Sequence, residues 1–168
     1  MKGVVDVFFP ATFSYATRRR FLILAVSMLS VLGMVVVAAA PAQADFNTEL
    51  QNHATGACLF QTFAGVRGVD CNNATGIVWT LRGWGDGTVQ VSSLDRCLDD
   101  SRFGLRMIPC HAGSSPFSAH QSWYRTHGAG GYEYRNQATG WCLDDSRFGV
   151  RMFPCNGMEY QRWSEGRF

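Results

Sequence analysis

The segment CLDDSRFGLRMIPC, at Cys97–Cys110, returns almost unchanged as CLDDSRFGVRMFPC at Cys142–Cys155. The two copies differ at only two of their 14 positions. A third, more diverged copy begins at Cys58 and ends at Cys71. Self-similarity with a period of about 40 residues is typical of a repeat architecture. The sequence therefore predicts three related structural units.

The six cysteines form three pairs with the same spacing of 13 residues. The pairs are Cys58 with Cys71, Cys97 with Cys110, and Cys142 with Cys155. Six cysteines allow many connectivities, but the threefold repetition favours the one in which each repeat closes its own loop. Because no C-x-x-C or H-x3-H spacing is present, the pattern favours disulfides over zinc. We expect neither a metal nor another cofactor.

Residues 1–44 have the features of a secretory signal peptide. Arg18–Arg20 supply the positive charge, Phe21–Ala40 the apolar core, and Ala42–Ala44 the small-x-small cleavage site. We predict cleavage after Ala44, which leaves residues 45–168 as the mature domain. An uncleaved anchor is the alternative, because the apolar core is long enough to span a bilayer.

Two export routes are open for this signal. Thr17–Leu22 resembles a twin-arginine signal, but a domain that needs disulfides would then fold in a reducing cytosol before export. General secretion is therefore preferred. We expect a secreted, extracellular bacterial protein with no membrane association after cleavage.

The charge of the mature segment excludes one class of partner. Residues 45–168 contain 11 basic and 12 acidic residues, and every basic residue is an arginine. These arginines are scattered among turns and aromatic residues, whereas nucleic-acid binding needs a clustered excess of basic charge. We expect no nucleic-acid partner and a single monomeric domain.

Short apolar runs separated by Gly, Pro, Asp and Asn residues predict an all-β domain. The runs are 58–60, 78–82, 88–91, 97–98, 106–108, 123–126, 132–135, 141–143 and 151–153. Glycine-rich turns are expected at 83–87 and 128–131. No window has a sustained 3.6-residue apolar period, so we expect no helix beyond single turns.

Each repeat also ends on a tryptophan, at Trp79, Trp123 and Trp163. In the second and third repeats this residue closes a Q-x-W triplet, whereas the first repeat has Ile77 in place of glutamine. Three large rings at equivalent positions would pack together around a pseudo-threefold axis. We therefore assign all three to the core.

These motifs together resemble those of the ricin B-type lectins. The opening N-x-x-T-G-x-C-L occurs at 52–59 and 136–143, and Q-x-W closes at 121–123 and 161–163. The resemblance covers Leu50–Trp163. It implies a β-trefoil of three lobes of about 40 residues, at approximately 50–88, 89–131 and 132–168. It also implies sugar binding.

The resemblance further implies a sugar site in each lobe. Its parts are an aspartate two residues after the first cysteine, an aromatic two before the second, a polar residue four before it, and the residues at the start of Q-x-W. Lobe three offers Asp144, Arg151, Phe153, Tyr160 and Gln161, and lobe two offers Asp99, Arg106, Ile108, His120 and Gln121. Lobe one has Phe60, Arg67, Val69 and Gly76, without a carboxylate.

Tyr160 and His120 stand where the family usually has asparagine, and two arginines replace uncharged residues. The sugar itself is therefore not implied, and a galactose-type sugar or another cell-surface or polysaccharide glycan fits equally well. Gln121 and Gln161 are expected to brace the fold more than to bind.

Sugar recognition needs a charged acceptor for hydroxyl groups and a flat ring for the apolar C–H face. Asp144 with Phe153 meets both needs, whereas Asp99 with Ile108 meets only the first, so lobe three is expected to hold the principal site. The second aspartates, Asp100 and Asp145, are expected in turns. Arg106 and Arg151 have two open roles, a salt bridge to one of these aspartates or contact with the ligand.

An enzyme is not expected, because no Ser/His/Asp set or nucleophile motif is present. The adjacent acids of each repeat do not resemble two glycosidase carboxylates that face each other across a bond. The alternative to a lectin is a protein-interaction or toxin-delivery module, because a fold does not determine a function.

Overall fold

The computed structural model describes residues 44–63, 65–72, 77–113, 115 and 117–166. Gly76 and the predicted signal peptide up to residue 43 lie outside them. The described residues form twelve strands and two 3-10 turns. The elements are β1 (Phe46–Asn52), β2 (Cys58–Gln61), β3 (Val66–Val69), β4 (Trp79–Gly83), β5 (Val89–Ser93), β6 (Arg96–Ser101), β7 (Gly104–Pro109), η1 (Ser118–Gln121), β8 (Ser122–Gly128), β9 (Gly131–Asn136), β10 (Cys142–Ser146), β11 (Gly149–Phe153), η2 (Glu159–Gln161) and β12 (Trp163–Gly166).

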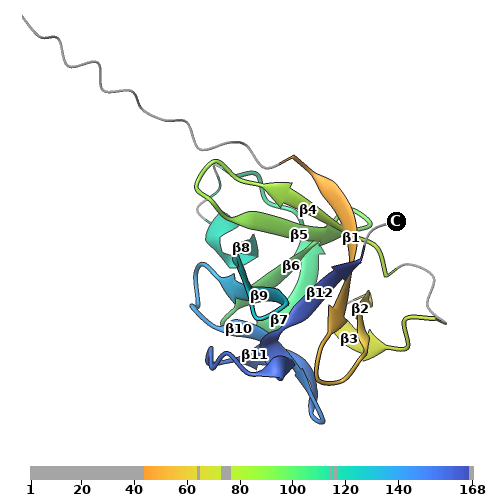
Figure 1. Cartoon of the computed structure of the whole chain (residues 1–168). Helices are drawn as coiled ribbons and strands as arrows, with labels where there is room; N and C mark the ends of the chain where they lie inside the picture. The colour runs from red at the N-terminus through yellow and green to blue at the C-terminus, as the bar shows by residue number, and fades with distance from the viewer. Residues whose placement is uncertain (1–43, 64, 73–76, 114, 116, 167–168) are drawn as a thin grey trace, which may run out of the picture. The chain divides into compact units, whose positions relative to one another are not determined.

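Six of the strands close into a barrel (Figure 1). They pair antiparallel in the order β1, β4, β5, β8, β9 and β12, and β12 returns to β1. The other six form the hairpins β2–β3, β6–β7 and β10–β11, which pair with β1, β5 and β9. Lobe one is β1–β4, lobe two β5–β8 and lobe three β9–β12. This is the predicted β-trefoil, and its only helical elements in the described residues are single turns.

Three strands are not predicted by the sequence: β1, β3 and β12. On β1, Thr48, Leu50 and Asn52 are the buried residues, so two of its three inward side chains are polar. Thr48 donates to the Gly166 carbonyl, and Asn52 donates to the Tyr160 carbonyl. Partners at the other end of the chain, and not local apolar alternation, therefore make β1 a strand.

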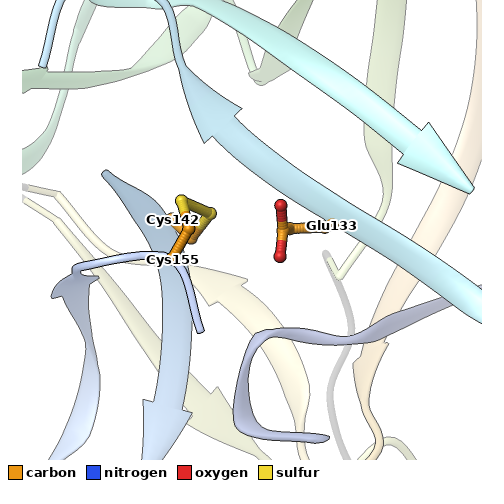
Figure 2. A group of neighbouring side chains, drawn as sticks. All are labelled: Glu133, Cys142 and Cys155. Carbon is orange, nitrogen blue, oxygen red and sulfur yellow. A yellow bond between two sulfur atoms is a disulfide. The ribbon is translucent and has the colours of Figure 1, made fainter. Parts of the chain in front are cut away.

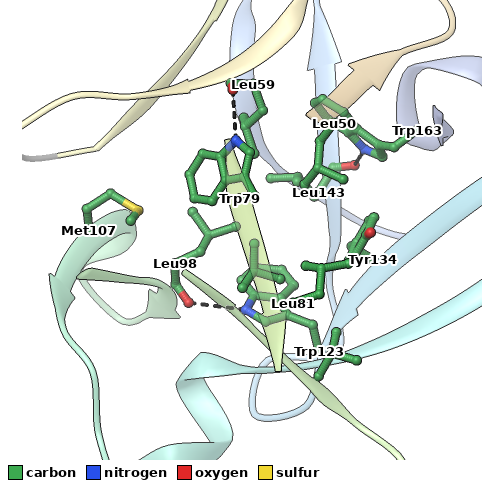
Figure 3. Packing of buried hydrophobic residues seen from close by; sticks show 12 residues of the cluster. Leu50, Leu59, Trp79, Leu81, Leu98, Met107, Trp123, Tyr134, Leu143 and Trp163 are labelled. Carbon is green, nitrogen blue, oxygen red and sulfur yellow. Dashed lines mark hydrogen bonds between the residues drawn. The ribbon is translucent and has the colours of Figure 1, made fainter. Parts of the chain in front are cut away.

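The three tryptophans lie fully buried, 0% exposed, in agreement with their predicted place in the core (Figure 3). They pack in one cluster with a leucine from the C-L dipeptide of each lobe, Leu59, Leu98 and Leu143. Each indole N–H donates to the carbonyl of the leucine in its own lobe. The donor–acceptor distances are 2.8 Å for Trp79 to Leu59, 3.1 Å for Trp123 to Leu98, and 3.1 Å for Trp163 to Leu143. The repeated motifs thus form one repeated contact.

The position two residues after each tryptophan breaks this symmetry. It holds Leu81 in lobe one, Arg125 in lobe two and Glu165 in lobe three. Arg125 Nε and Nη2 donate to the two carboxylate oxygens of Glu165 at 2.6 and 2.5 Å, and the Tyr134 hydroxyl donates to the same carboxylate. The Arg125 and Glu165 side chains are only 15% and 9% exposed. An ion pair that lines a hollow of about 570 Å³ therefore stands where lobe one has a buried leucine.

The charges of Arg125 and Tyr134 follow from their burial and from their contacts with Glu165. Burial alone would lower the pKa of the Arg125 guanidinium, but hydrogen bonds from Arg125 to Glu165 and the Glu165 charge outweigh it, so that pKa is raised. Burial, together with the Glu165 charge, raises the pKa of the Tyr134 hydroxyl well above its ordinary value of 10.0. The cluster is thus a charged arginine and a neutral tyrosine around one carboxylate.

The predicted cysteine pairing is confirmed. Each lobe closes its own disulfide, and no described cysteine is free. The bonds are Cys58–Cys71, Cys97–Cys110 and Cys142–Cys155. Three disulfides in one domain indicate an oxidising environment. Within the part of the chain that the structure describes, no helix is long and apolar enough to cross a membrane.

Candidate functional site

Hairpins β6–β7 and β10–β11 each place an aspartate directly opposite an arginine. Asp99 faces Arg106 and Asp144 faces Arg151 in the strand register. Both arginines donate Nε to the aspartate at 2.8 Å. The aspartate side chains are 3% exposed, whereas the arginines are 32% and 35% exposed. Of the two roles left open for these arginines, the structure shows the salt bridge. The guanidinium is the more accessible partner in each pair.

Lobe one replaces this ion pair with a ring contact. Phe60 faces Arg67 at the same position of hairpin β2–β3, and the guanidinium carbon lies 5.5 Å from the ring centroid. As the sequence predicts, lobe one has no carboxylate there. It lacks the anionic half of the site found in the other two lobes.

In lobe two the ion pair lies in a pocket of about 490 Å³. Asp99 and Arg106 line it together with two exposed rings, Phe103 and Phe117. The Arg106 guanidinium carbon lies 4.8 Å from the Phe103 ring centroid. His120 also lines the pocket, as do Ile108 and His111. The arrangement combines hydrogen-bond donors, a carboxylate and aromatic surface around one hollow.

His120 is held by its Nδ1, which lies 2.8 Å from the Asp100 carbonyl oxygen. A carbonyl only accepts, so Nδ1 carries the proton and Nε2 remains for other partners. The structure thus brings His120 to the predicted site with a defined tautomer.

The Phe117 wall of the pocket was not predicted. Ten residues separate Cys110 from Gln121, whereas five separate Cys155 from Gln161. Phe117 lies in this longer segment, where lobe three has no counterpart. The signal that could have found it is a large apolar residue among Gly, Ser and Pro in the segment where the repeats differ in length.

In lobe three, two exposed rings, Phe148 and Phe153, lie against the arginine of the ion pair. Tyr160 is also exposed. The Arg151 guanidinium carbon lies 4.5 Å from the Phe153 ring centroid and 5.2 Å from that of Phe148. Arg151 therefore covers part of the ring that the sequence assigned to the sugar, and Phe148 is the more exposed of the two.

Gln121 and Gln161, considered from the sequence for both binding and bracing, are buried, and both ends of each side-chain amide are bonded to backbone groups. They are 0% and 1% exposed. Gln121 accepts from the His111 N–H and donates to the Pro109 carbonyl at 2.7 and 3.0 Å. Gln161 makes the equivalent pair of bonds with Asn156 and Pro154. Both side chains close the loop that follows the disulfide, which is the bracing role also considered from the sequence.

Asp100 and Asp145 are strand residues, so their prediction as turn residues is wrong. They lie within β6 and β10. Asp100 accepts a short hydrogen bond from Thr139 Oγ1, and Asp145 accepts one from Thr55 Oγ1 at 2.7 Å. Each bond joins two different lobes. The turn is stabilised by the following serine and not by the aspartate, because Ser101 Oγ accepts a hydrogen bond from the Phe103 N–H at 3.3 Å.

The threonine of the N-x-x-T-G motif therefore joins neighbouring lobes by a hydrogen bond to an aspartate. Asp145 with Thr55 joins lobes three and one, and Asp100 with Thr139 joins lobes two and three. At the equivalent positions between lobes one and two, the chain has Gln61 and Leu94. Gln61 Oε1 is buried and has no hydrogen-bond partner among the described residues. Two of the three lobe boundaries thus have this aspartate–threonine hydrogen bond.

Burial raises the pKa of the Asp100 and Asp145 carboxyls above their ordinary value of 3.8, despite the hydrogen bonds from the threonines. The folded state therefore binds more protons than the unfolded state between pH 3.8 and the raised pKa. In that window each carboxyl lowers the stability as the pH rises.

Asp100→Asn should accordingly gain stability relative to the wild type as the pH rises from about 3 to about 7. Asparagine keeps an oxygen for Thr139 but cannot ionise. Urea unfolding at several pH values measures the difference, and Asp95→Asn, an exposed carboxylate in the preceding turn, is the control. A difference that stays constant over this range would contradict the burial effect.

Glu133, Cys142 and Cys155 form the one group of candidate metal ligands found in the described residues, with ligand atoms within 4.8 Å of one another (Figure 2). The two sulfur atoms are joined in a disulfide. A disulfide offers no thiolate, which is the form of cysteine that binds metal ions. The group is therefore not a metal site.

No family model matches the chain. No curated protein matches it. Among solved structures it is similar to ThreeFoil, a designed threefold symmetric protein, with a TM-score of 0.62 and 19% identity over 73% of this chain and 99% of that chain.

It is also similar to SeviL, solved bound to asialo-GM1 saccharide, with a TM-score of 0.62 and 13% identity over 74% of this chain and 98% of that chain. A mosquitocidal holotoxin matches with a TM-score of 0.65 and 11% identity, over 74% of this chain but only 17% of the toxin. At these identities the similarity establishes the fold, and the chain is a β-trefoil.

Proposed function

We propose that this protein is a secreted carbohydrate-binding protein, a lectin of the ricin B type without catalytic activity. The observation that carries the proposal is the lobe-two pocket, in which Asp99 and Arg106 lie beside the rings of Phe103 and Phe117. Hydroxyl groups need charged partners, and the apolar face of a sugar needs a ring. The SeviL structure, a trefoil bound to a saccharide, supports the same reading.

In this proposal Asp99 acts in two ways. Its carboxylate holds the Arg106 guanidinium by the Nε bond, so that the remaining guanidinium N–H groups are presented to sugar oxygens. Its negative charge also accepts hydrogen bonds from a sugar hydroxyl that reaches the pocket. Charge-assisted bonds of both kinds are about twice as strong as neutral ones.

Asp144, Arg151 and the rings of Phe148, Phe153 and Tyr160 form the corresponding site of lobe three. Lobe one binds no sugar in this proposal, because Phe60 stands where the carboxylate is needed. The sequence ranks lobe three first. The Phe117 wall supports the opposite order, because it adds the aromatic surface that Ile108 does not supply.

Asp99→Asn should reduce glycan affinity by about 10- to 150-fold, and Asp144→Asn by less. The reason is the loss of one charge-assisted contact of about 1.5–3 kcal/mol at the more enclosed site. A glycan array identifies a ligand, and calorimetric titration of the wild type and both variants measures the loss. Asp95→Asn, in the exposed turn before β6, is the matched control.

The reverse order of the two losses would restore lobe three as the principal site. If neither variant lost affinity for a glycan that the wild type binds, neither aspartate contributes to binding, and the sugar site lies elsewhere. Thermal unfolding of each variant separates loss of binding from loss of fold.

We further propose that residues 1–44 are removed on export and that residues 45–168 act as one monomeric domain of three repeats, approximately 50–88, 89–131 and 132–168. Three disulfides support an oxidising destination outside the cell. Mass spectrometry of the protein from culture medium tests the cleavage after Ala44.

The second candidate function is a toxin-delivery or protein-interaction module. One observation favours it: the mosquitocidal holotoxin and Cry35Ab1 both match over a trefoil-sized part, 17% and 35% of their chains. An array without a bound glycan, together with capture of a defined protein partner, would favour this candidate over the lectin.

A further inference from the structure

Trp141 is a tryptophan at a position where lobes one and two have none. It is 47% exposed, whereas the three core tryptophans are fully buried. The corresponding residue, directly before the first cysteine, is Ala57 in lobe one and Arg96 in lobe two. A large exposed indole at one of three equivalent positions therefore has no role in the threefold packing of the core.

The Trp141 side chain lines a groove of about 630 Å³ between lobes two and three. Leu105, Val150 and Met152 supply its apolar surface. The interlobe pair Asp100 and Thr139 supplies polar groups. The groove thus offers a flat ring, apolar surface and hydrogen-bonding groups at the same boundary.

The equivalent boundary between lobes three and one is packed closed at this point. Ala57 replaces Trp141 there, and Gly68 replaces Met152. A Cβ atom added at Gly68 would lie 3.0 Å from Asp145 Oδ2 and 3.1 Å from the Ala57 Cβ. Small residues bring the two lobes into contact at that boundary, so the groove between lobes two and three has no equivalent there.

The groove adjoins both candidate sugar sites. Ser101 and Arg102 line the groove and also line the lobe-two pocket. Arg151 lines the groove and forms the ion pair of lobe three. The two hollows therefore adjoin at Ser101 and Arg102, so a chain of sugar units that starts in the lobe-two pocket can extend past Arg102 into the groove that Trp141 lines.

We propose that the groove is a second saccharide subsite, in which Trp141 stacks on the next unit of a glycan held in the lobe-two pocket. The inference rests on the proposed lectin function and names its ligand class, an oligosaccharide of at least two units. Trp141 supplies the ring for the apolar face of this unit. Arg102 lies between the two subsites and offers guanidinium donors to both units.

The test compares single sugars with longer saccharides that contain them. The probes are three matched pairs: galactose and lactose, xylose and xylotriose, N-acetylglucosamine and chitotriose. The wild type should bind the oligomer of its preferred pair about 10-fold more tightly than the single sugar. Trp141→Ala should abolish this preference and leave the affinity for the single sugar unchanged. Alanine suits the local backbone, because Ala57 occupies the same position in lobe one.

Two control variants test whether the effect is specific to Trp141 and to the second subsite. Phe63→Ala removes another exposed ring, on hairpin β2–β3 of lobe one, and should leave the preference intact. Asp99→Asn should weaken binding of the single sugar and the oligomer alike, because it acts in the first subsite.

The proposal is overturned if Trp141→Ala binds both members of the pair as the wild type does, or if the wild type has no preference for the oligomer. In either case binding of the single sugar leaves the lectin function standing. If none of the six probes and no glycan on an array binds, the lectin function itself fails, and the subsite fails with it.

Discussion

Trp123→Ala should lower the free energy of unfolding by about 3–5 kcal/mol. The side chain is fully buried in the cluster that all three lobes share. Its removal leaves a cavity, and it also deprives the Leu98 carbonyl of the indole N–H that lies 3.1 Å away. Urea unfolding followed by circular dichroism measures the change.

Two further variants separate the contributions to this loss. Trp141→Ala deletes the same side chain at an exposed position and should shift the unfolding midpoint little. Trp123→Phe keeps a large ring but removes the N–H donor, so it should lose less stability than Trp123→Ala. A Trp123→Ala protein with the midpoint of the wild type would contradict the threefold packing of the core.

Arg125→Leu should destabilise the protein by about 3–5 kcal/mol, because it leaves the Glu165 carboxylate in the barrel without its cation. Both side chains are largely buried and joined by two hydrogen bonds. Leucine is the residue that lobe one uses at the same position, Leu81, so its shape suits the barrel. The loss therefore reports the unpaired charge.

The double variant Arg125→Leu/Glu165→Gln removes both charges and keeps an oxygen for the Tyr134 hydroxyl. It should recover most of the stability lost by Arg125→Leu alone, since a buried ion pair is often no more stable than neutral groups of similar size. Free energies of unfolding of the wild type, both single variants and the double variant give the coupling energy. Equal losses in Arg125→Leu and in the double variant would show that the charge of Glu165 is not the cause.

The fold could be predicted where its determinants repeat along the chain. Cysteine spacing identified the disulfides, and the recurring tryptophans identified the core, because each signal lies within one repeat. Strand β1 could not be predicted in this way. Its buried Thr48 and Asn52 bond to Gly166 and Tyr160, more than 100 residues away, so its strand character comes from long-range pairing.

In the candidate site, too, contacts within one repeat could be predicted and contacts between lobes could not. Asp99 and Arg106 are close in sequence and face each other across one hairpin, so their ion pair could be considered from the sequence. The role of Asp100 could not be, because its partner Thr139 is 39 residues away and belongs to another lobe. Phe117 was missed for a different reason: it lies where the repeats differ in length, and a comparison of repeats gives no expectation there.

The unequal lobe boundaries have a consequence for the entropy of binding. The boundary between lobes one and two has Gln61 and Leu94 in place of the Asp–Thr hydrogen bond, and Gln61 Oε1 is buried without a partner among the described residues, so local opening of the domain should begin there. Both candidate sites and the Trp141 groove lie instead at the boundary between lobes two and three, where Thr139 donates a hydrogen bond to Asp100. A ligand bound there meets a preorganised surface and orders few protein groups on arrival, which lowers the entropic cost of association.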